Sequence, residues 1–144
     1  MHIIIEQTKN YPKRMQYDPT TDAFSETEWN NLLHTRGVSF PYGWLKESGA
    51  PPNKHLDVIL ISREHCELGD EFPIRIIGVF KRSDNDHKLV AVNTNRKETD
   101  INELPEDESS ELYKLYPRID ANAGEGWFGA EIANDIISVF YEND

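Results

Sequence analysis

The fold of this 144-residue chain is decided by residues 54–93, which read KHLDVILISREHCELGDEFPIRIIGVFKRSDNDHKLVAVN. This stretch contains three apolar segments rich in β-branched residues, which predict three strands joined through a turn at 67–70 and a loop at 82–87. Residues 58–61 are all apolar, which predicts a strand covered on both faces. Asp57 comes directly before them, so we expect its carboxylate to lie in a largely dry space. There it must be hydrogen-bonded, neutralised by a cation or protonated.

The loop 82–87 carries two further aspartates, Asp84 and Asp86. Because they are two residues apart, their side chains point the same way if the loop is extended. Two neighbouring carboxylates repel each other unless they are solvated or bind a cation. The sequence therefore predicts an acidic pair beside Asp57.

Length and composition bound the class of protein. The chain has 144 residues, of which 38% are hydrophobic, and we expect one domain over 1–144. Its one cysteine, Cys66, forms neither an internal disulfide nor a zinc pattern, which fits a reducing cytoplasm. No apolar run approaches the roughly 18 residues of a membrane span, and no secretion signal is visible. A soluble cytoplasmic protein is expected, with the oligomeric state open.

The charge balance is strongly acidic, with a formal net charge of -11. Nucleic acid is excluded as a partner because phosphate backbones require clustered Lys and Arg. An acidic protein suits cations or a basic protein partner, and the same charge can serve solubility alone. Residues 98–111 contain seven acids, which indicate either a solvated helix face or a partner-binding patch. They are Glu98, Asp100, Glu103, Glu106, Asp107, Glu108 and Glu111.

The flanking segments add a few short elements. Residues 2–7 predict a strand, residues 9–22 a short strand within a hairpin, and residues 25–33 a short helix or a loop packed by Trp29. All three tryptophans are expected in the core rather than on a stacking surface. Helical spacing of apolar residues predicts two helices late in the chain, over 101–116 and 130–140. The expected class is α+β, a small closed or highly curved antiparallel β-barrel with two flanking helices.

Several segments together resemble one family. They are YGW (42–44), LDVILI (56–61), IRIIGVFKRSD (74–84), KLVAVN (88–93), DINELP (100–105) and EGWFGAE (125–131). In this order they resemble the soluble, magnesium-dependent inorganic pyrophosphatases of the β-barrel type. The resemblance implies an OB-like barrel and the hydrolysis of pyrophosphate to phosphate with Mg²⁺ as cofactor.

The resemblance also implies a set of site residues. The positions that match metal ligands are Glu6, Asp57, Asp84 and Asp86. Those that match phosphate-binding residues are Arg14, Tyr42, Lys88 and Tyr116. Asp57 and Lys54 occupy catalytic positions, because Lys54 stands where the family has an aspartate that orients the attacking water.

The metal motif of this chain departs from the family pattern. The family has Asp-Gly-Asp-Pro-x-Asp, whereas residues 52–57 read PNKHLD, so Pro52 and Lys54 replace two of three aspartates. An ammonium about 4 Å from a metal position turns attraction into repulsion of a few kcal/mol at an effective dielectric of about 20. Losing the water-orienting base costs about 10²–10⁴ in rate.

These departures lead to two expectations. First, we hypothesise that Lys54 pairs with Asp57 and the loop aspartates where relatives hold magnesium, so that hydrolysis is weak or lost. The alternative is a non-catalytic acidic module, such as an immunity or inhibitor protein against a basic toxin or enzyme. The sequence gives little indication of other chemistry. The five histidines do not have the paired spacing of zinc ligands, although His55 and His87 flank the expected site.

Overall fold

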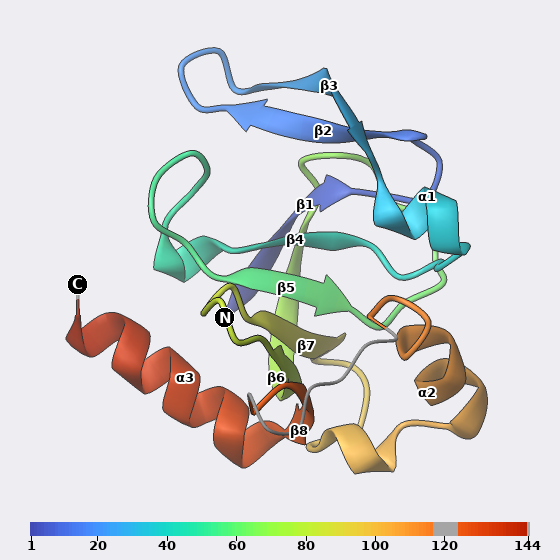
Figure 1. Cartoon of the computed structure of the whole chain (residues 1–144), viewed down its shortest axis with the longest axis vertical. Helices are drawn as coiled ribbons and strands as arrows, with labels where there is room; N and C mark the ends of the chain where they lie inside the picture. Colours follow the sequence, from blue (N-terminus) through green and yellow to red (C-terminus); the bar gives the residue numbers. More distant parts are fainter. Residues whose placement is uncertain (117–123, 144) are drawn as a thin grey trace.

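Five strands close into a barrel in the computed structural model, which describes residues 1–116 and 124–143 (Figure 1). The strand order is β1-β4-β5-β7-β6, and β6 pairs back onto β1. A further strand, β8 (Gly126–Gly129), pairs with the second half of β6. The expected α+β barrel is confirmed. Its strands are β1 (His2–Gln7), β4 (Tyr42–Leu45), β5 (Asp57–Leu60), β6 (Glu71–Lys81) and β7 (Lys88–Asn93).

One pair in the barrel is parallel, whereas the sequence predicted antiparallel strands throughout. β5 and β7 run in the same direction, and Asp57 lies opposite Lys88 in their register. A parallel pair needs a crossover connection. Here β6 supplies it, because the chain runs back through β6 before β7 begins. The crossover therefore brings the first residues of β5 and β7 to the same end of the barrel.

Both faces of the central strands are buried, as the apolar run predicted. Val58 and Leu60 belong to a cluster that draws on all five barrel strands and on Ala133 and Ile137 of α3 (Ala130–Glu142). Ile59 and Ile61 belong to a second cluster, which α1 (Leu32–Arg36), η2 (Ile101–Glu103) and α2 (Glu106–Leu112) cover. The alternation follows from the two-residue period of a strand.

The helices differ in part from the prediction. The predicted helix over 101–116 is divided into η2 and α2, because Pro105 lies between them and α2 begins directly after it. The short helix considered for residues 25–33 lies later than expected. It is α1, which begins after Asn31, whose side chain accepts the N–H of Leu33, and ends at Gly37 with φ 65°. A one-turn 3₁₀ helix, η1 (Lys46–Ser48), follows β4.

The predicted hairpin is present as a separate two-stranded sheet of β2 (Lys13–Asp18) and β3 (Ala23–Asn30). The prediction for residues 25–33 was wrong in part, since most of that segment is β3. Trp29 was expected in the core but is 63% exposed. In β2 half-buried and exposed residues alternate, so one side of this strand is partly covered. Tyr17 lies on that side, with its ring centroid 4.9 Å from that of buried Trp44.

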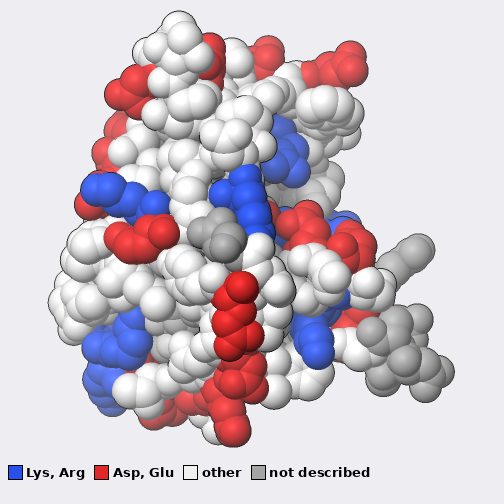
Figure 2. All heavy atoms as spheres, turned by 90° about the vertical axis from the view of Figure 1, so that its left-hand side faces the viewer, with Lys and Arg blue, Asp and Glu red and all other residues white. Residues whose placement is uncertain are grey.

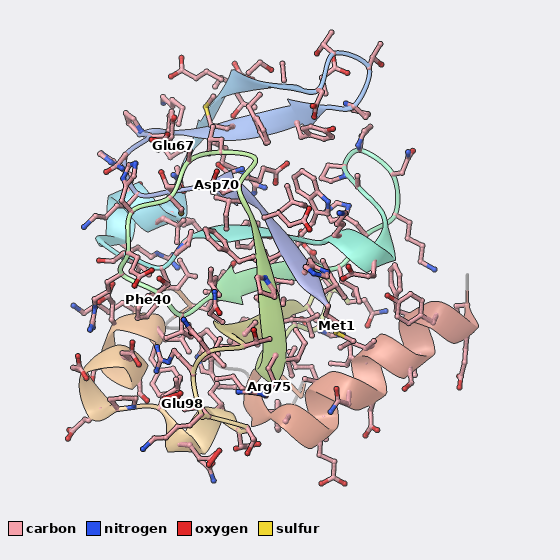
Figure 3. The ribbon with its side chains drawn as sticks, turned by 180° about the vertical axis from the view of Figure 1, so that it is seen from behind. Met1, Phe40, Glu67, Asp70, Arg75 and Glu98 are labelled. Atoms are coloured by element: carbon pink, nitrogen blue, oxygen red, sulfur yellow. The ribbon has the colours of Figure 1, made fainter. Side chains whose placement is uncertain are left out.

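Two arginines hold the loop that follows β7. Arg96 pairs with Glu98 at 2.8 Å and with Glu108 of α2 at 2.6 Å. Arg75 of β6 donates to the carbonyl oxygens of Arg96 and Glu98, and Figure 3 shows Arg75 and Glu98 side by side. None of the described helices has the length and apolar content to cross a membrane.

Candidate functional site

Asp57 lies between two cations at the start of β5. Its Oδ2 is 2.7 Å from Lys88 Nζ, and its Oδ1 is 3.0 Å from His55 Nε2. Burial opposes ionisation, but the hydrogen bond from His55 and the charge of Lys88 outweigh it and hold the pKa of Asp57 well below its usual range. The expectation that this carboxylate needs a partner in a dry space is confirmed.

Lys88 has three oxygen partners. In addition to the hydrogen bond to Asp57, its ammonium donates to the hydroxyl oxygen of Tyr42 at 3.0 Å and forms an ion pair with Asp86 Oδ1 at 3.0 Å. The side chain is only 6% exposed, and these partners are what makes its burial tolerable. Burial lowers the pKa of Lys88, but the charges of Asp57 and Asp86 and the hydrogen bond to Asp57 together outweigh burial and raise the pKa.

His55 is a cation in this arrangement. Its Nδ1 is 2.7 Å from the carbonyl oxygen of Asn53, and its Nε2 faces the carboxylate of Asp57. Both partners only accept hydrogen bonds, so both ring nitrogens must donate, which requires the imidazolium form. The hydrogen bond to Asp57 accordingly raises the pKa of His55.

Lys54 does not make the predicted ion pair. Its Nζ donates to the carbonyl oxygen of Asn143 at 3.3 Å and lies 4.6 Å from the ring centroid of Phe140. The loop before β5 therefore directs Lys54 toward the end of α3. Lys88 and His55 neutralise Asp57 instead.

The two loop aspartates diverge, contrary to the extended geometry that was considered. Asn85 between them adopts φ 66°, so the loop turns at that residue. Asp84 pairs with Arg82 at 2.8 Å, whereas Asp86 pairs with Lys88. Only Asp86 therefore reaches the site around Asp57.

Two adjoining pockets surround these groups. The large pocket, about 860 Å³, is lined by the predicted site residues Glu6, Arg14, Lys54, Asp57, Asp86 and Lys88. Burial raises the pKa of Glu6 in its floor, against the opposing charge of Arg14. The small pocket, about 240 Å³, is lined by all four predicted phosphate-binding residues, Arg14, Tyr42, Lys88 and Tyr116.

The small pocket has the charge of an anion site. Its lining includes three cations, Arg14, Arg82 and Lys88, and one carboxylate, Asp86. Tyr116 is held there by stacking on Phe80, with ring centroids 4.7 Å apart. Arg82 and His55 are the site residues that the sequence did not assign. Their spacing of two residues from Asp84 and from Asp57 was the available signal.

Comparison with known proteins now adds the family. The family model for inorganic pyrophosphatase matches residues 3–143. The chain belongs to the inorganic pyrophosphatase family. Searching curated protein sequences gave no match.

Solved structures of inorganic pyrophosphatases have the same fold. The Neisseria gonorrhoeae enzyme is similar with a TM-score of 0.74 at 19% identity, over 99% of this chain and 90% of that one. The Helicobacter pylori enzyme gives 0.71 at 16% identity, over 99% and 92%. The Ehrlichia chaffeensis enzyme gives 0.68 at 20% identity, over 96% and 91%.

Inorganic pyrophosphatases are generally metal-dependent, so the donor set of this member must be tested against a metal. Both oxygens of Asp57 are bound to cations, and Asp84 is turned toward Arg82. Within residues 1–116 and 124–143, no three His, Cys, Asp or Glu side chains are grouped to hold an ion. Mg²⁺ requires near-octahedral oxygen ligands. These residues do not fit a magnesium cluster as they are arranged.

Proposed function

We propose that this pyrophosphatase family member binds pyrophosphate or a related phosphoanhydride and hydrolyses it weakly or not at all. The observation that supports this best is the position of Asp57 between Lys88 and His55. The carboxylate that matches a family metal ligand is neutralised by the protein's own cations. The small pocket beside it retains the positive charge that attracts a phosphate anion.

The chemistry of hydrolysis supports low activity. Attack of water on a phosphoanhydride requires the phosphate charge to be neutralised and the water to be oriented and activated. The resemblance assigns an aspartate at this position to orienting the attacking water, and Lys54 replaces it. The Nζ of Lys54 donates a hydrogen bond to the carbonyl oxygen of Asn143. Because a positioned base contributes about 10²–10⁴ in rate, a large loss of turnover follows.

Two measurements test this function. Isothermal calorimetry without divalent ions should detect pyrophosphate binding, and Arg14→Gln should weaken it about tenfold or more because an anion contact is lost. Lys46→Gln is the matched control, since Lys46 pairs with Glu71 and lines neither pocket. Absence of pyrophosphate binding would overturn the proposal.

Turnover is measured as phosphate release from pyrophosphate with Mg²⁺ or Mn²⁺, beside a pyrophosphatase with all three motif aspartates. We expect turnover at least about 10²-fold below that enzyme. Turnover equal to it, and abolished by Asp57→Ala, would show instead that Asp57 releases its cations and binds metal.

A further inference from the structure

We infer that the ligand is a nucleoside polyphosphate, whose phosphates bind in the small pocket and whose base lies against Trp29 in the large pocket. This inference rests on the proposed binding of phosphoanhydrides and deepens it by naming the class of ligand. Three observations carry it: the volumes of the two adjoining pockets, the apolar part of the lining around Trp29, and a set of side-chain amides that make no hydrogen bond within the part of the chain that the structure describes.

The two pockets adjoin each other. They share five lining residues, which are Arg14, Asn30, Leu32, Asp86 and Lys88. Pockets that enclose drug-sized ligands measure roughly 300–1,000 Å³, and the large pocket alone is about 860 Å³. Pyrophosphate consists of only two phosphoryl groups. A pyrophosphate in the small pocket would therefore leave most of the large one unfilled.

Part of the lining of the large pocket is apolar, among charged and amide side chains. Trp29 of β3 is 63% exposed, and Met15, Leu32, Pro51 and Pro52 line the same space. Pyrophosphate is charged throughout and gains nothing from such a wall. A nucleobase does gain, because its flat face stacks on an aromatic ring irrespective of base identity.

Polar groups that suit a base edge or a sugar lie along this wall. Gln16 and Asn53 line the large pocket, and their side-chain amides make no hydrogen bond to the described part of the chain. Asn30 accepts from Lys13 through Oδ1, and its NH₂ group has no partner among the same residues. An amide both donates and accepts, as recognition of base edges and hydroxyls requires.

The charges are arranged to orient such a ligand. Arg14 and Lys88 line both pockets, and Arg82 lines the small one. The small pocket has one carboxylate, Asp86, against its three cations, whereas the large pocket has three carboxylates, so the phosphates are attracted to the small pocket. In the large pocket Asp57 is already neutralised by Lys88 and His55, which limits its repulsion of an anion nearby. The base is thus left on the side of Trp29.

The experiment compares ADP, pyrophosphate and adenosine by calorimetry without divalent ions. ADP should bind about tenfold or more tightly than pyrophosphate, because stacking adds to the phosphate contacts, and adenosine should bind weakly. Trp29→Ala should remove the advantage of ADP and leave pyrophosphate affinity unchanged. Phe128→Ala is the matched control, since Phe128 is 36% exposed and lines neither pocket.

Fluorescence gives a second readout. Trp44 is 4% exposed and Trp127 packs against Phe80 and Tyr116, so Trp29 is the tryptophan that a base in the pocket quenches. ADP should quench the protein emission, and Trp29→Phe should lose the quenching while it keeps the affinity. If Trp29→Ala changes the melting temperature, Trp29→Leu replaces it as the non-aromatic variant.

The outcomes separate the two proposals. If pyrophosphate binds and ADP binds no better, the inference fails and the proposed function stands. An advantage of ADP that survives Trp29→Ala also overturns the inference. If neither ligand binds, the proposed function itself fails.

Discussion

Lys88 determines the character of the site, because one ammonium joins residues of three different elements. It contacts Asp57 of β5, Tyr42 of β4 and Asp86 of the loop before β7. Removing its charge leaves Asp57 buried beside a single cation, His55. Breaking a buried ion pair is costly because the remaining charge is uncompensated.

Lys88→Met should therefore lower the free energy of unfolding by about 3–5 kcal/mol, measured by urea denaturation. The double variant Asp57→Asn with Lys88→Met should recover part of this loss, because it removes both charges. Lys46→Met is the control, since Lys46 and Glu71 are 52% and 40% exposed and their pair contributes little. Equal losses for Lys88→Met and Lys46→Met would contradict the buried pair.

His55 should make stability depend on pH. The pKa of His55 is raised in the folded protein by Asp57, so folding is favoured where the imidazolium is present in both states, below about pH 6.5. This contribution is lost as the pH rises through the folded-state pKa. The difference in free energy of unfolding between the wild type and His55→Gln should therefore shrink from pH 6 to pH 9. A constant difference would show that His55 is not charged in the fold.

Among the elements, the loop between β7 and α2 depends most on charge. The carboxylates of Glu98 and Glu108 are 7% and 12% exposed and converge on Arg96. The hydrogen bond from Arg96 lowers the pKa of Glu98 to about 2. Residues 98–111 contain seven acids. Six of them, including Glu98 and Glu108, have a hydrogen-bond or ion-pair partner in the described protein. Glu108 pairs with Arg96 and Glu111 accepts from Ser39, both outside α2, whereas Asp100 and Glu103 cap η2. These acids therefore serve several local contacts rather than one solvated face or patch.

Arg96→Met should lower the free energy of unfolding by about 1.5–3 kcal/mol at pH 7, because two largely buried carboxylates lose a charged donor. The contribution of Glu98 is present above its unfolded pKa of about 4.3 and is lost as the pH falls toward 2. The difference between wild type and variant should thus shrink between pH 5 and pH 2. A penalty that does not change with pH would contradict this origin.

The strands could be predicted because they consist of the apolar and β-branched residues that are typical of buried strands. The apolar run 58–61 is buried on both faces, as its composition indicated, and the predicted strand over 88–93 is present. The second strand of the hairpin could not be predicted in the same way. The order Ser-Glu-Thr-Glu (25–28) imitates a helix cap, and pairing with β2 outweighs that local signal.

The ion pair of Asp57 was predicted with the wrong lysine. The resemblance named Lys88 as a phosphate ligand, and the departure from the family motif suggested Lys54 as the partner of Asp57, but Lys88 is the lysine that pairs with it. Lys54 is close to Asp57 in sequence, whereas Lys88 is 31 residues away and meets it only through the parallel register. Register between distant strands is a tertiary property that local spacing does not contain.

At the scale of the whole molecule, the hairpin and the barrel form the two sides of the large pocket. Gln7 of β1 connects them by donating to the carbonyl oxygen of Met15 at 2.6 Å and accepting its N–H at 2.8 Å. Tyr17 adds the contact with Trp44. On the face seen in Figure 2, acidic and basic side chains are interspersed, so the net charge of -11 is not concentrated there in one acidic patch.

Gln7→Leu should loosen the hairpin without unfolding the barrel. It removes the two hydrogen bonds to Met15 and replaces the amide by an apolar side chain of similar size. We expect faster amide hydrogen exchange in residues 13–30 and unchanged protection in 57–60 and 88–93. Pyrophosphate affinity should fall with it, since Arg14 lies on β2. Uniform acceleration across the barrel would mean that hairpin and barrel open together.

The parallel pairing of β5 with β7 also orders events during synthesis. Asp57 leaves the ribosome 31 residues before Lys88, so a nascent chain that stops short of β7 carries an acid without its lysine and a β5 edge without its neighbour. Exposed edges of this kind pair readily with other chains. When β7 pairs with β5, Lys88 neutralises Asp57 and the edge of β5 is covered in the same step. The charge of Asp57 is therefore balanced at the same time as the chain is protected against aggregation.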